Sequence, residues 1–349
     1  MQEYFDLHLL KYQIDAIYVT DASNIRYITG FKGSFGIAII IKEETILVTD
    51  QRYLDEAKMY CKNIRVIEVK SLEWQKIINN CSVIAFETKD MTIERFAKLK
   101  KKFNNPKWIP IYPIIENMRR QKNSFEISQI AKGSEITCDI LNEVLKTIKE
   151  NDTEMDIAWR LQKIAYESHN IEKLSFDPIV AFEENSAIPH HKTNNTKLKK
   201  GDAILIDFGI KYHGYSTDMT RTVFFQEVSN EKEGIYNKVL EAQKIGIDSY
   251  KLNKSCSFSH KIVNDYFKKN QLDEFFTHSL GHGIGLDTHE APNISINSKD
   301  YFSEWDTISC EPGIYLPEKF GVRIEDIGVM RESGFEIFTS SPKELIVIK

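Results

Sequence analysis

Three features of secreted and membrane proteins are scarce in this sequence: paired cysteines, basic residues near the N-terminus, and long apolar runs. Its five cysteines are scattered among 349 residues and none forms a C-x-x-C pair. Such an odd, scattered set is typical of reduced thiols in a reducing compartment. The most apolar stretch, Gly36–Ile41, is far too short to cross a membrane. We therefore expect a cytoplasmic protein without a signal peptide or a membrane partner.

An excess of positive charge is also missing. The formal net charge is −5, which argues against a broad basic face for nucleic acid. The short lysine clusters at 100–102 and 197–200 are explained as solvated surface. Hydrophobic residues make up 42% and charged residues 28% of the chain, as in ordinary globular proteins. The length predicts two domains.

The first third of the chain alternates short Ile- and Val-rich segments with helical ones, which is an α/β pattern. The predicted strands are Ile14–Val19, Gly36–Ile41, Thr45–Val48, Ile64–Val69 and Val83–Phe86, and the predicted helices are Arg52–Cys61, Leu72–Asn79 and Ile93–Phe103. Gly30, Gly33 and Gly36 lack the G-x-G pair of a dinucleotide site, so we interpret them as turn glycines. Pro106, Pro110 and Pro113 indicate a connecting segment. We place the domain boundary after it, giving domains 1–122 and 123–349.

The second domain begins with two helical patterns. Asn123 and Glu126 resemble a capping box before a long helix, and a second helix starts at Thr153 and runs to about residue 169. Strands dominate afterwards. The predicted strands are Ala203–Phe208, Thr217–Phe225, Thr307–Cys310 and Val322–Met330, and the helices between them are Ile235–Tyr250 and Phe258–Lys269.

Two of these strands end in an acid and return with another. Asp207 ends an apolar run, where a carboxylate must be paired or bound. A turn centred between residues 212 and 213 would place Asp218 directly opposite it, with Cβ atoms about 5 Å apart. A hairpin centred near residue 318 would likewise place Glu311 opposite Glu325. One such pair could be a carboxylate dyad sharing a proton, but two pairs favour bound cations.

A glycine-rich segment adds histidines to these acids. His278 and His282 lie in Thr-His-Ser-Leu-Gly-His-Gly, where the glycines allow close backbone approach. Taken singly, each of these residues has a structural explanation, such as a turn cap or a core histidine. Together, four carboxylates and one imidazole balance two divalent ions with a bridging hydroxide between them. The oxygen-rich ligand set favours Mn²⁺, with Co²⁺ or Zn²⁺ as alternatives.

These motifs resemble one known family. The segments Asp207–Gly209, Gly214–Thr222, His278–Glu290, Glu311–Tyr315 and Arg323–Asp326 are similar to those of the pita-bread metallopeptidases, family M24, in the Xaa-Pro branch. Ser23–Phe31 and Thr49–Tyr53 resemble the amino domain of the same branch. The resemblance implies a smaller N-terminal creatinase-like α/β domain followed by a C-terminal pita-bread catalytic domain.

The resemblance also implies roles for individual residues. The implied metal ligands are Asp207, Asp218, His282, Glu311 and Glu325, with Asp218 and Glu325 bridging both ions. Glu311 would also act as general base. His190, His278 and His289 would line the substrate pocket, and Arg323 and Tyr315 would support Asp207 from behind.

The implied activity is hydrolysis of the bond before a proline. The main prediction is an Xaa-Pro aminopeptidase, and the alternative is an Xaa-Pro dipeptidase, or prolidase. Prolidases of this size often carry an arginine after the His-Glu-x-Pro segment, and Asn293 stands there in this chain. A third hypothesis is a non-catalytic binding module on the same fold. Relatives with this amino domain commonly pair, so a homodimer is expected.

Overall fold

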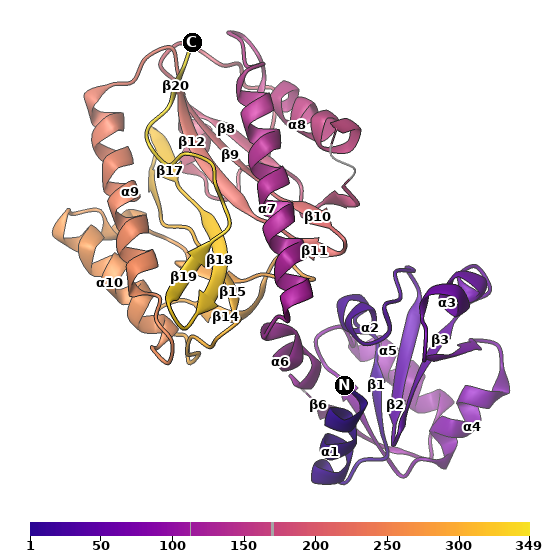
Figure 1. The fold of residues 1–349 in the computed structure, drawn as a ribbon. Helices are drawn as coiled ribbons and strands as arrows, with labels where there is room; N and C mark the ends of the chain where they lie inside the picture. The colour runs from indigo at the N-terminus through magenta and orange to yellow at the C-terminus, as the bar shows by residue number, and fades with distance from the viewer. Residues whose placement is uncertain (112, 169–170) are drawn as a thin grey trace. The chain divides into compact units, whose positions relative to one another are not determined.

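The computed structural model describes residues 1–111, 113–168 and 171–349 and divides into two compact units. Unit 1 comprises Met1–Arg119 and unit 2 comprises Arg120–Lys349 (Figure 1). The exact position of the domain boundary, which we expect after residue 122, stays a prediction. Across the described ranges, no helix combines the length and apolar character needed to cross a bilayer.

Unit 1 is built on a mixed sheet with the strand order β4-β3-β2-β1-β5-β6. Its strands are β1 (Ala16–Val19), β2 (Gly36–Ile41), β3 (Glu44–Thr49), β4 (Arg65–Glu68), β5 (Val83–Glu87) and β6 (Lys107–Ile111). Its helices are α1 (Gln2–Tyr12), α2 (Ala22–Thr29), α3 (Leu54–Tyr60), α4 (Leu72–Asn80), α5 (Ile93–Lys102) and α6 (Ile114–Arg120).

Strand periodicity separates two cores on the faces of this sheet. Ile17 and Val19 of β1 pack with α1, α2, α3 and α6, whereas Ala16 and Tyr18 pack with α4 and α5 on the other face. Successive side chains of a strand point to opposite faces, so one short strand contributes to both cores. Unit 1 is therefore a three-layer α/β structure, and the predicted fold class is confirmed.

The proline-marked segment is not only a connection, as predicted, but contains the edge strand β6. Pro110 lies opposite Phe86 of β5. Proline has no N–H to donate, but an edge strand leaves one side of its backbone unpaired and tolerates it. Three further elements without a predicted counterpart are α1, α2 and α6.

Unit 2 opens with α7 (Ser124–Leu145), whose capping box is confirmed: the Asn123 side chain accepts from the Glu126 N–H and the Glu126 side chain accepts from the Asn123 N–H. Helix α8 (Glu154–Ser168) follows. Residue 169, to which the sequence extends this helix, lies outside the described residues. The remaining helices are α9 (Asn230–Ser249), α10 (Cys256–Lys269) and the short 3-10 helices η1 (Glu183–Ala187) and η2 (Asp273–Phe275).

The strands of unit 2 form two main sheets, ordered β20-β12-β9-β8 and β14-β13-β15-β18-β19, and two small ones, β11-β10-β7 and β16-β17. They are β7 (Lys173–Leu174), β8 (Ile179–Phe182), β9 (Ala203–Phe208), β10 (Ile210–Tyr212), β11 (Tyr215–Ser216), β12 (Met219–Phe225), β13 (Gly281–Gly283), β14 (Glu290–Ile294), β15 (Thr307–Cys310), β16 (Gly313–Leu316), β17 (Phe320–Arg323), β18 (Asp326–Arg331), β19 (Gly334–Ile337) and β20 (Val347–Ile348).

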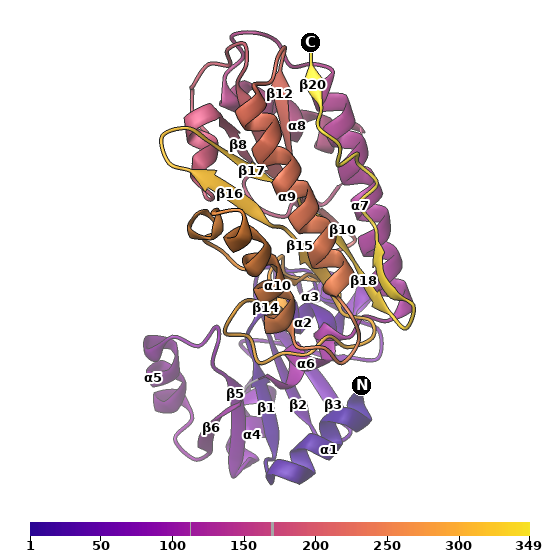
Figure 2. The same cartoon turned by 90° about the vertical axis from the view of Figure 1, so that its left-hand side faces the viewer.

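Each main sheet is covered by one pair of helices. Helices α7 and α8 pack on β8, β9 and β12, and α9 and α10 pack on strands β14 to β17. Figure 2 shows α9 running along β17 and β15. Among the predicted metal ligands, Asp207 lies near the end of β9 and His282 within β13, and the other three lie directly beside strand ends: Asp218 before β12, Glu311 after β15 and Glu325 before β18.

The predicted strand Val322–Met330 is divided in two by the structure. Strand β17 pairs with β16, and β18 pairs with β15. Ile324 and Glu325 lie at this change of partner, and the Glu325 N–H donates to the Thr220 carbonyl of a different strand at 3.1 Å. The interruption places Glu325 where three strands meet.

Candidate metal centre and active site

Asp207 and Asp218 lie on two adjacent segments, but their register differs from the prediction. The turn is centred between residues 213 and 214, so Asp207 pairs with Thr220 and not with Asp218. The error is two residues, and a shift of two keeps a side chain on the same face of a strand. The two segments approach closely at Gly209, where a Cβ would lie 1.8 Å from the Thr217 carbonyl oxygen.

The predicted register of Glu311 and Glu325 is confirmed. On one side of these residues Cys310 pairs with Asp326, and on the other Gly313 pairs with Arg323. Both ladders have the same register, which sets Glu311 opposite Glu325 between them. Cys310 points away from Glu311 into the core, where it is fully buried, as strand alternation predicts.

His282 lies on β13 and points one ring nitrogen at these acids. A Cβ at Gly281 would lie 2.2 Å from the Ser309 carbonyl oxygen, so glycine permits the close approach of β13 to β15. The Nδ1 of His282 bonds the Gly283 carbonyl oxygen at 3.0 Å and therefore carries the proton. Its Nε2 lies 3.4 Å from Glu311 Oε1 and 3.7 Å from Asp218 Oδ2.

Two observations indicate that the five side chains fit divalent cations. Asp207 Oδ1, Asp218 Oδ1 and Glu325 Oε1 are buried and make no hydrogen bond within the described parts of the chain. Donor atoms of Asp218, His282 and Glu325 all lie within 4.8 Å of one another. Buried carboxylate oxygens without partners are costly unless a cation binds them, and carboxylates with one imidazole are ligands that Mn²⁺ and its neighbours accept.

The electrostatics of the cluster agree with this fit. Without a cation, burial raises the pKa of Glu311 to about 8. Burial and the neighbouring carboxylates raise the pKa of Asp218 and of Glu325 well above its ordinary range. Burial lowers the pKa of His282, which keeps its Nε2 lone pair free for a ligand bond. A cation would reverse the shifts of the acids.

Arg323 connects the two acid pairs from behind. Its Nη2 donates to Asp207 Oδ2, and its Nε donates to the Thr220 hydroxyl at 3.0 Å. That hydroxyl donates in turn to Glu325 Oε2 at 2.8 Å. One guanidinium thus fixes the second oxygen of two carboxylates and leaves the first oxygen of each free. Thr220 was not predicted; its place on the same strand face as Asp218, two residues away, is the signal that indicates it.

Arg323 also fixes His278 through Tyr315. Its Nη1 donates to the Tyr315 hydroxyl at 2.6 Å, and this hydroxyl lies 2.8 Å from His278 Nε2. The His278 Nδ1 bonds the Ser279 carbonyl oxygen at 2.8 Å, so Nδ1 donates and Nε2 accepts from Tyr315. Burial and the Arg323 charge lower the pKa of His278 to about 3. His278 is a neutral ring with both nitrogens engaged.

One cavity of about 310 Å³ brings all the predicted site residues together. Its lining includes Asp207, Asp218, His282, Glu311, Glu325, His190, His278, His289 and Arg323. His289 is exposed, and its ring centroid lies 4.2 Å from that of His282. Phe176, Ile179 and Pro189 form an apolar wall that the sequence did not predict. Asn293 is exposed and is not among the lining residues.

Comparisons with known proteins cover almost the whole chain. Residues 128–332 match the model of metallopeptidase family M24, and residues 7–121 match the creatinase/prolidase N-terminal domain. The chain is 32% identical to an Xaa-Pro dipeptidase of Pyrococcus horikoshii, covering 96% of this chain and 95% of that protein. The structure of an Xaa-Pro dipeptidase from Bacillus anthracis matches with a TM-score of 0.94 at 30% identity, over 99% and 98% of the two chains. An X-Pro aminopeptidase from Thermotoga maritima matches with a TM-score of 0.90 at 34% identity, over 96% and 98%.

Proposed function

The chain belongs to metallopeptidase family M24, and from this premise we propose that it is an Xaa-Pro dipeptidase. The main support for metal-dependent hydrolysis is a set of buried carboxylate oxygens that make no hydrogen bond to a described residue and lie beside His282 Nε2. The substrate class is supported by relatives named Xaa-Pro dipeptidase, from Pyrococcus horikoshii and Bacillus anthracis. These names favour the alternative that the sequence offered over its main prediction, an aminopeptidase.

The ligand roles in this proposal follow the sequence-based assignment. Asp207 would hold one ion, His282 and Glu311 would hold the other, and Asp218 and Glu325 would contribute to both. Two divalent ions, which we propose to be Mn²⁺, supply Lewis acidity and lower the pKa of water. Arg323 holds Asp207 and, through Thr220, Glu325 by one carboxylate oxygen each, so that Asp207 Oδ1 and Glu325 Oε1 would be available to the ions.

The proton transfers fall to residues of the cavity wall. We assign Glu311 as the general base that takes the proton of the attacking water, because its carboxylate lines the cavity 3.4 Å from His282 Nε2. Partial burial and the neighbouring His282 lower the pKa of His289 to about 4, so its ring is neutral, and we assign it to donate a hydrogen bond that steadies the carbonyl oxygen or the departing proline nitrogen. His278 cannot exchange protons while Tyr315 occupies its Nε2, so it shapes the pocket beside His190.

A second candidate, Xaa-Pro aminopeptidase, is favoured by two observations. The exposed Asn293 contributes no cation to the cavity, so no arginine at this position binds the carboxylate of a dipeptide. The Thermotoga maritima relative is named an X-Pro aminopeptidase. A longer peptide needs no carboxylate contact at the proline, whereas a dipeptide gains affinity from one.

The test compares two peptides with the Mn²⁺-loaded enzyme. We expect Leu-Pro to be hydrolysed and Leu-Pro-Gly-Gly to be cut at least a hundredfold more slowly, with both activities abolished by a chelator. Comparable cleavage of the tetrapeptide would establish the aminopeptidase instead. Cleavage of neither peptide by protein with bound metal would support a non-catalytic module.

The ligand set is tested separately by Asp218→Ala. We expect this variant to lose activity and to bind less metal, measured by elemental analysis after gel filtration. Normal metal content with full activity would remove Asp218 from the bridging position. Exposed Glu184 provides a control, because Glu184→Ala changes a carboxylate outside the cavity.

Two broader expectations belong to the same proposal. The five cysteines are all free thiols, which supports a reducing compartment such as the cytoplasm. A homodimer stays a prediction from the family resemblance, and sedimentation at micromolar concentration tests it.

A further inference from the structure

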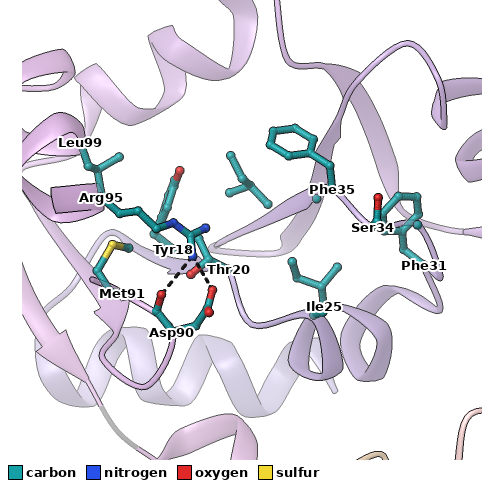
Figure 3. A pocket seen from close by; sticks show the side chains of 14 residues that line it. Tyr18, Thr20, Ile25, Phe31, Ser34, Phe35, Asp90, Met91, Arg95 and Leu99 are labelled. Carbon is teal, nitrogen blue, oxygen red and sulfur yellow. Dashed lines mark hydrogen bonds and ion pairs between the residues drawn. The ribbon is translucent and has the colours of Figure 1, made fainter. Parts of the chain in front are cut away.

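Unit 1 contains a second cavity, of about 320 Å³, formed only by residues of that unit. It lies between the end of β1, the segment joining α2 to β2, and the start of α5 (Figure 3). Small-molecule sites typically enclose about 300–1,000 Å³. The volume is at the lower end of this range and limits an occupant to the size of an amino acid or a dipeptide.

The topology of unit 1 places this cavity at a switch point of the sheet. Strands β1 and β5 are adjacent and parallel, so their carboxyl ends meet at one edge. The helix that follows β1, α2, packs on one face of the sheet, and the helix that follows β5, α5, packs on the other. The chain segments after the two strands therefore diverge and leave a crevice, which is where open α/β sheets bind their ligands.

The polar end of the cavity carries groups without protein partners. Thr20 is 8% exposed, and its hydroxyl makes no hydrogen bond to any described residue. Its main-chain N–H donates to Glu87 Oε2 at 2.8 Å, which fixes the position of the hydroxyl. Arg95 Nη1 donates to the carbonyl oxygen of Asp90 at 3.0 Å and to its Oδ2 at 2.6 Å. Figure 3 shows Thr20, Asp90 and Arg95 together at one end.

The Arg95–Asp90 pair leaves donors and acceptors available. No other protein group in the described chain bonds the Nε and Nη2 of Arg95 or the Oδ1 of Asp90. Both side chains are about half exposed, so solvent or a ligand reaches them. The pair carries no net charge, and it offers one cationic and one anionic contact side by side.

Most of the other large side chains of the wall are apolar, and the hydroxyl-bearing Tyr18 and Ser34 lie among them. The apolar side chains include Ile25, Phe31, Phe35, Met91 and Leu99, and Figure 3 shows the two phenylalanines on the side away from Arg95. Phe31 is held edge-on against the ring of a tyrosine with centroids 5.8 Å apart. This division into a charged end and an apolar end matches an amphipathic ligand.

We propose that this cavity binds the zwitterion of a free α-amino acid with an apolar side chain. Arg95 and the Thr20 hydroxyl receive the carboxylate, Asp90 receives the ammonium group, and the apolar wall encloses the side chain. A simple carboxylate or a simple amine would satisfy only one member of the ion pair, whereas a zwitterion satisfies both with charge-assisted hydrogen bonds. The inference is independent of the peptidase assignment, since its test measures binding and not hydrolysis.

The experiment is equilibrium dialysis of the full-length protein against labelled L-phenylalanine, with 3-phenylpropanoate and phenethylamine as competitors. We expect binding with a Kd of about 1 mM or tighter, and competition by either analogue at least tenfold weaker than by unlabelled L-phenylalanine. Arg95→Gln should weaken binding roughly tenfold or more, and Thr20→Val roughly three- to tenfold. Arg65→Gln is the control, because Arg65 is also a surface arginine of unit 1 paired with acids, outside the cavity.

Each outcome bears on the proposal. Binding of L-phenylalanine is assigned to this cavity only if both Thr20→Val and Arg95→Gln weaken it. This criterion distinguishes it from binding of a reaction product at the catalytic cavity. Thr20→Val removes a hydroxyl that has no protein partner and keeps the β-branched shape, so this variant should fold normally. Absence of binding, binding unchanged in both variants, or equal competition by either analogue would overturn the assignment.

Discussion

Chelating the divalent ions proposed for unit 2 should make the stability of that unit depend on pH. In the cation-free cluster the pKa of Glu311 rises from 4.5 to about 8 because of burial. Between these values the folded protein holds a proton that the unfolded chain has released. Stability must therefore fall as pH rises through this window, and the loss is complete above pH 8.

The size of this effect follows from the same shift. Each pKa unit corresponds to about 1.4 kcal/mol, so Glu311 alone destabilises the fully ionised cluster by about 5 kcal/mol. About 3 kcal/mol of this loss falls between pH 6 and pH 9. Asp218 and Glu325, whose pKa values are also raised by burial, act in the same direction. Bound cations neutralise the carboxylates and should remove most of the slope.

The assay is urea unfolding of metal-loaded and chelated protein at pH 6, 7, 8 and 9, followed by the fluorescence of Trp305 in a variant lacking the other tryptophans. The chelated protein should lose at least about 3 kcal/mol over this range, while the loaded protein changes by much less. Glu311→Gln should make the curve of the chelated protein less steep, with Asp218 and Glu325 producing the slope that remains, and the exposed Glu184→Gln should leave it unchanged. Equal slopes with and without metal would refute the reasoning.

Three other substitutions test the site and its support. His289→Ala should lower kcat roughly a hundredfold or more while metal content stays normal; loss of metal would mean that His289 is a ligand. Lys122→Met removes the cation 3.3 Å from the buried Glu290 carboxylate and should cost about 3–5 kcal/mol in urea unfolding, most of which the double variant Lys122→Met/Glu290→Leu should restore; no restoration would contradict this account. Gly209→Ala forces a Cβ to 1.8 Å from a main-chain oxygen of the adjoining segment. It should lower the free energy of unfolding by more than about 2 kcal/mol and should also lower the metal content. Gly234→Ala, with open space around its Cβ, is the control, and equal behaviour of the two variants would exclude the close approach as the cause.

The acids of the site could be predicted because strand patterns carry information on faces. Asp207 and Glu311 each follow an apolar run, and a strand with period two fixes the face on which they project. The registers were less secure. The hairpin before Glu325 was placed correctly, whereas the one before Asp218 was two residues off, because a turn at His213 and Gly214 is not distinguished by composition from one at its neighbours.

Other elements of the fold were missed for local reasons. Helix α1 mixes apolar and polar residues with little periodicity, since it buries only Phe5 and Leu9, and so lacks the pattern that identifies a helix. Strand β6 contains Pro110, which lowers strand propensity but is accepted at an edge. Such placements depend on which neighbours are present in the folded chain, and a single sequence does not specify them.

The pattern of residues does not indicate the connections of Arg323; only the family resemblance implied its support of Asp207, and its bond to Thr220 was not predicted. Its contacts with Asp207 and Thr220 span 116 and 103 residues. No local pattern shows that one guanidinium will join two carboxylate pairs and a tyrosine. The candidate ligands were thus accessible from the sequence, while the bonds that orient them required the folded chain.

The agreement in register between the two ladders around Glu311 and Glu325 bears on protein engineering. Because β15 and β18 pair on one side of the acids and β16 and β17 on the other, the tip of the β16–β17 hairpin does not determine their alignment. Its residue Glu318 is exposed and adopts a positive φ of 60°. A peptide tag or reporter loop grafted at this tip would leave the two acids opposite each other. The tip is therefore an attachment point only a few residues from the acids along the chain, and the hydrogen-bonded pairs of β16 and β17 separate it from them.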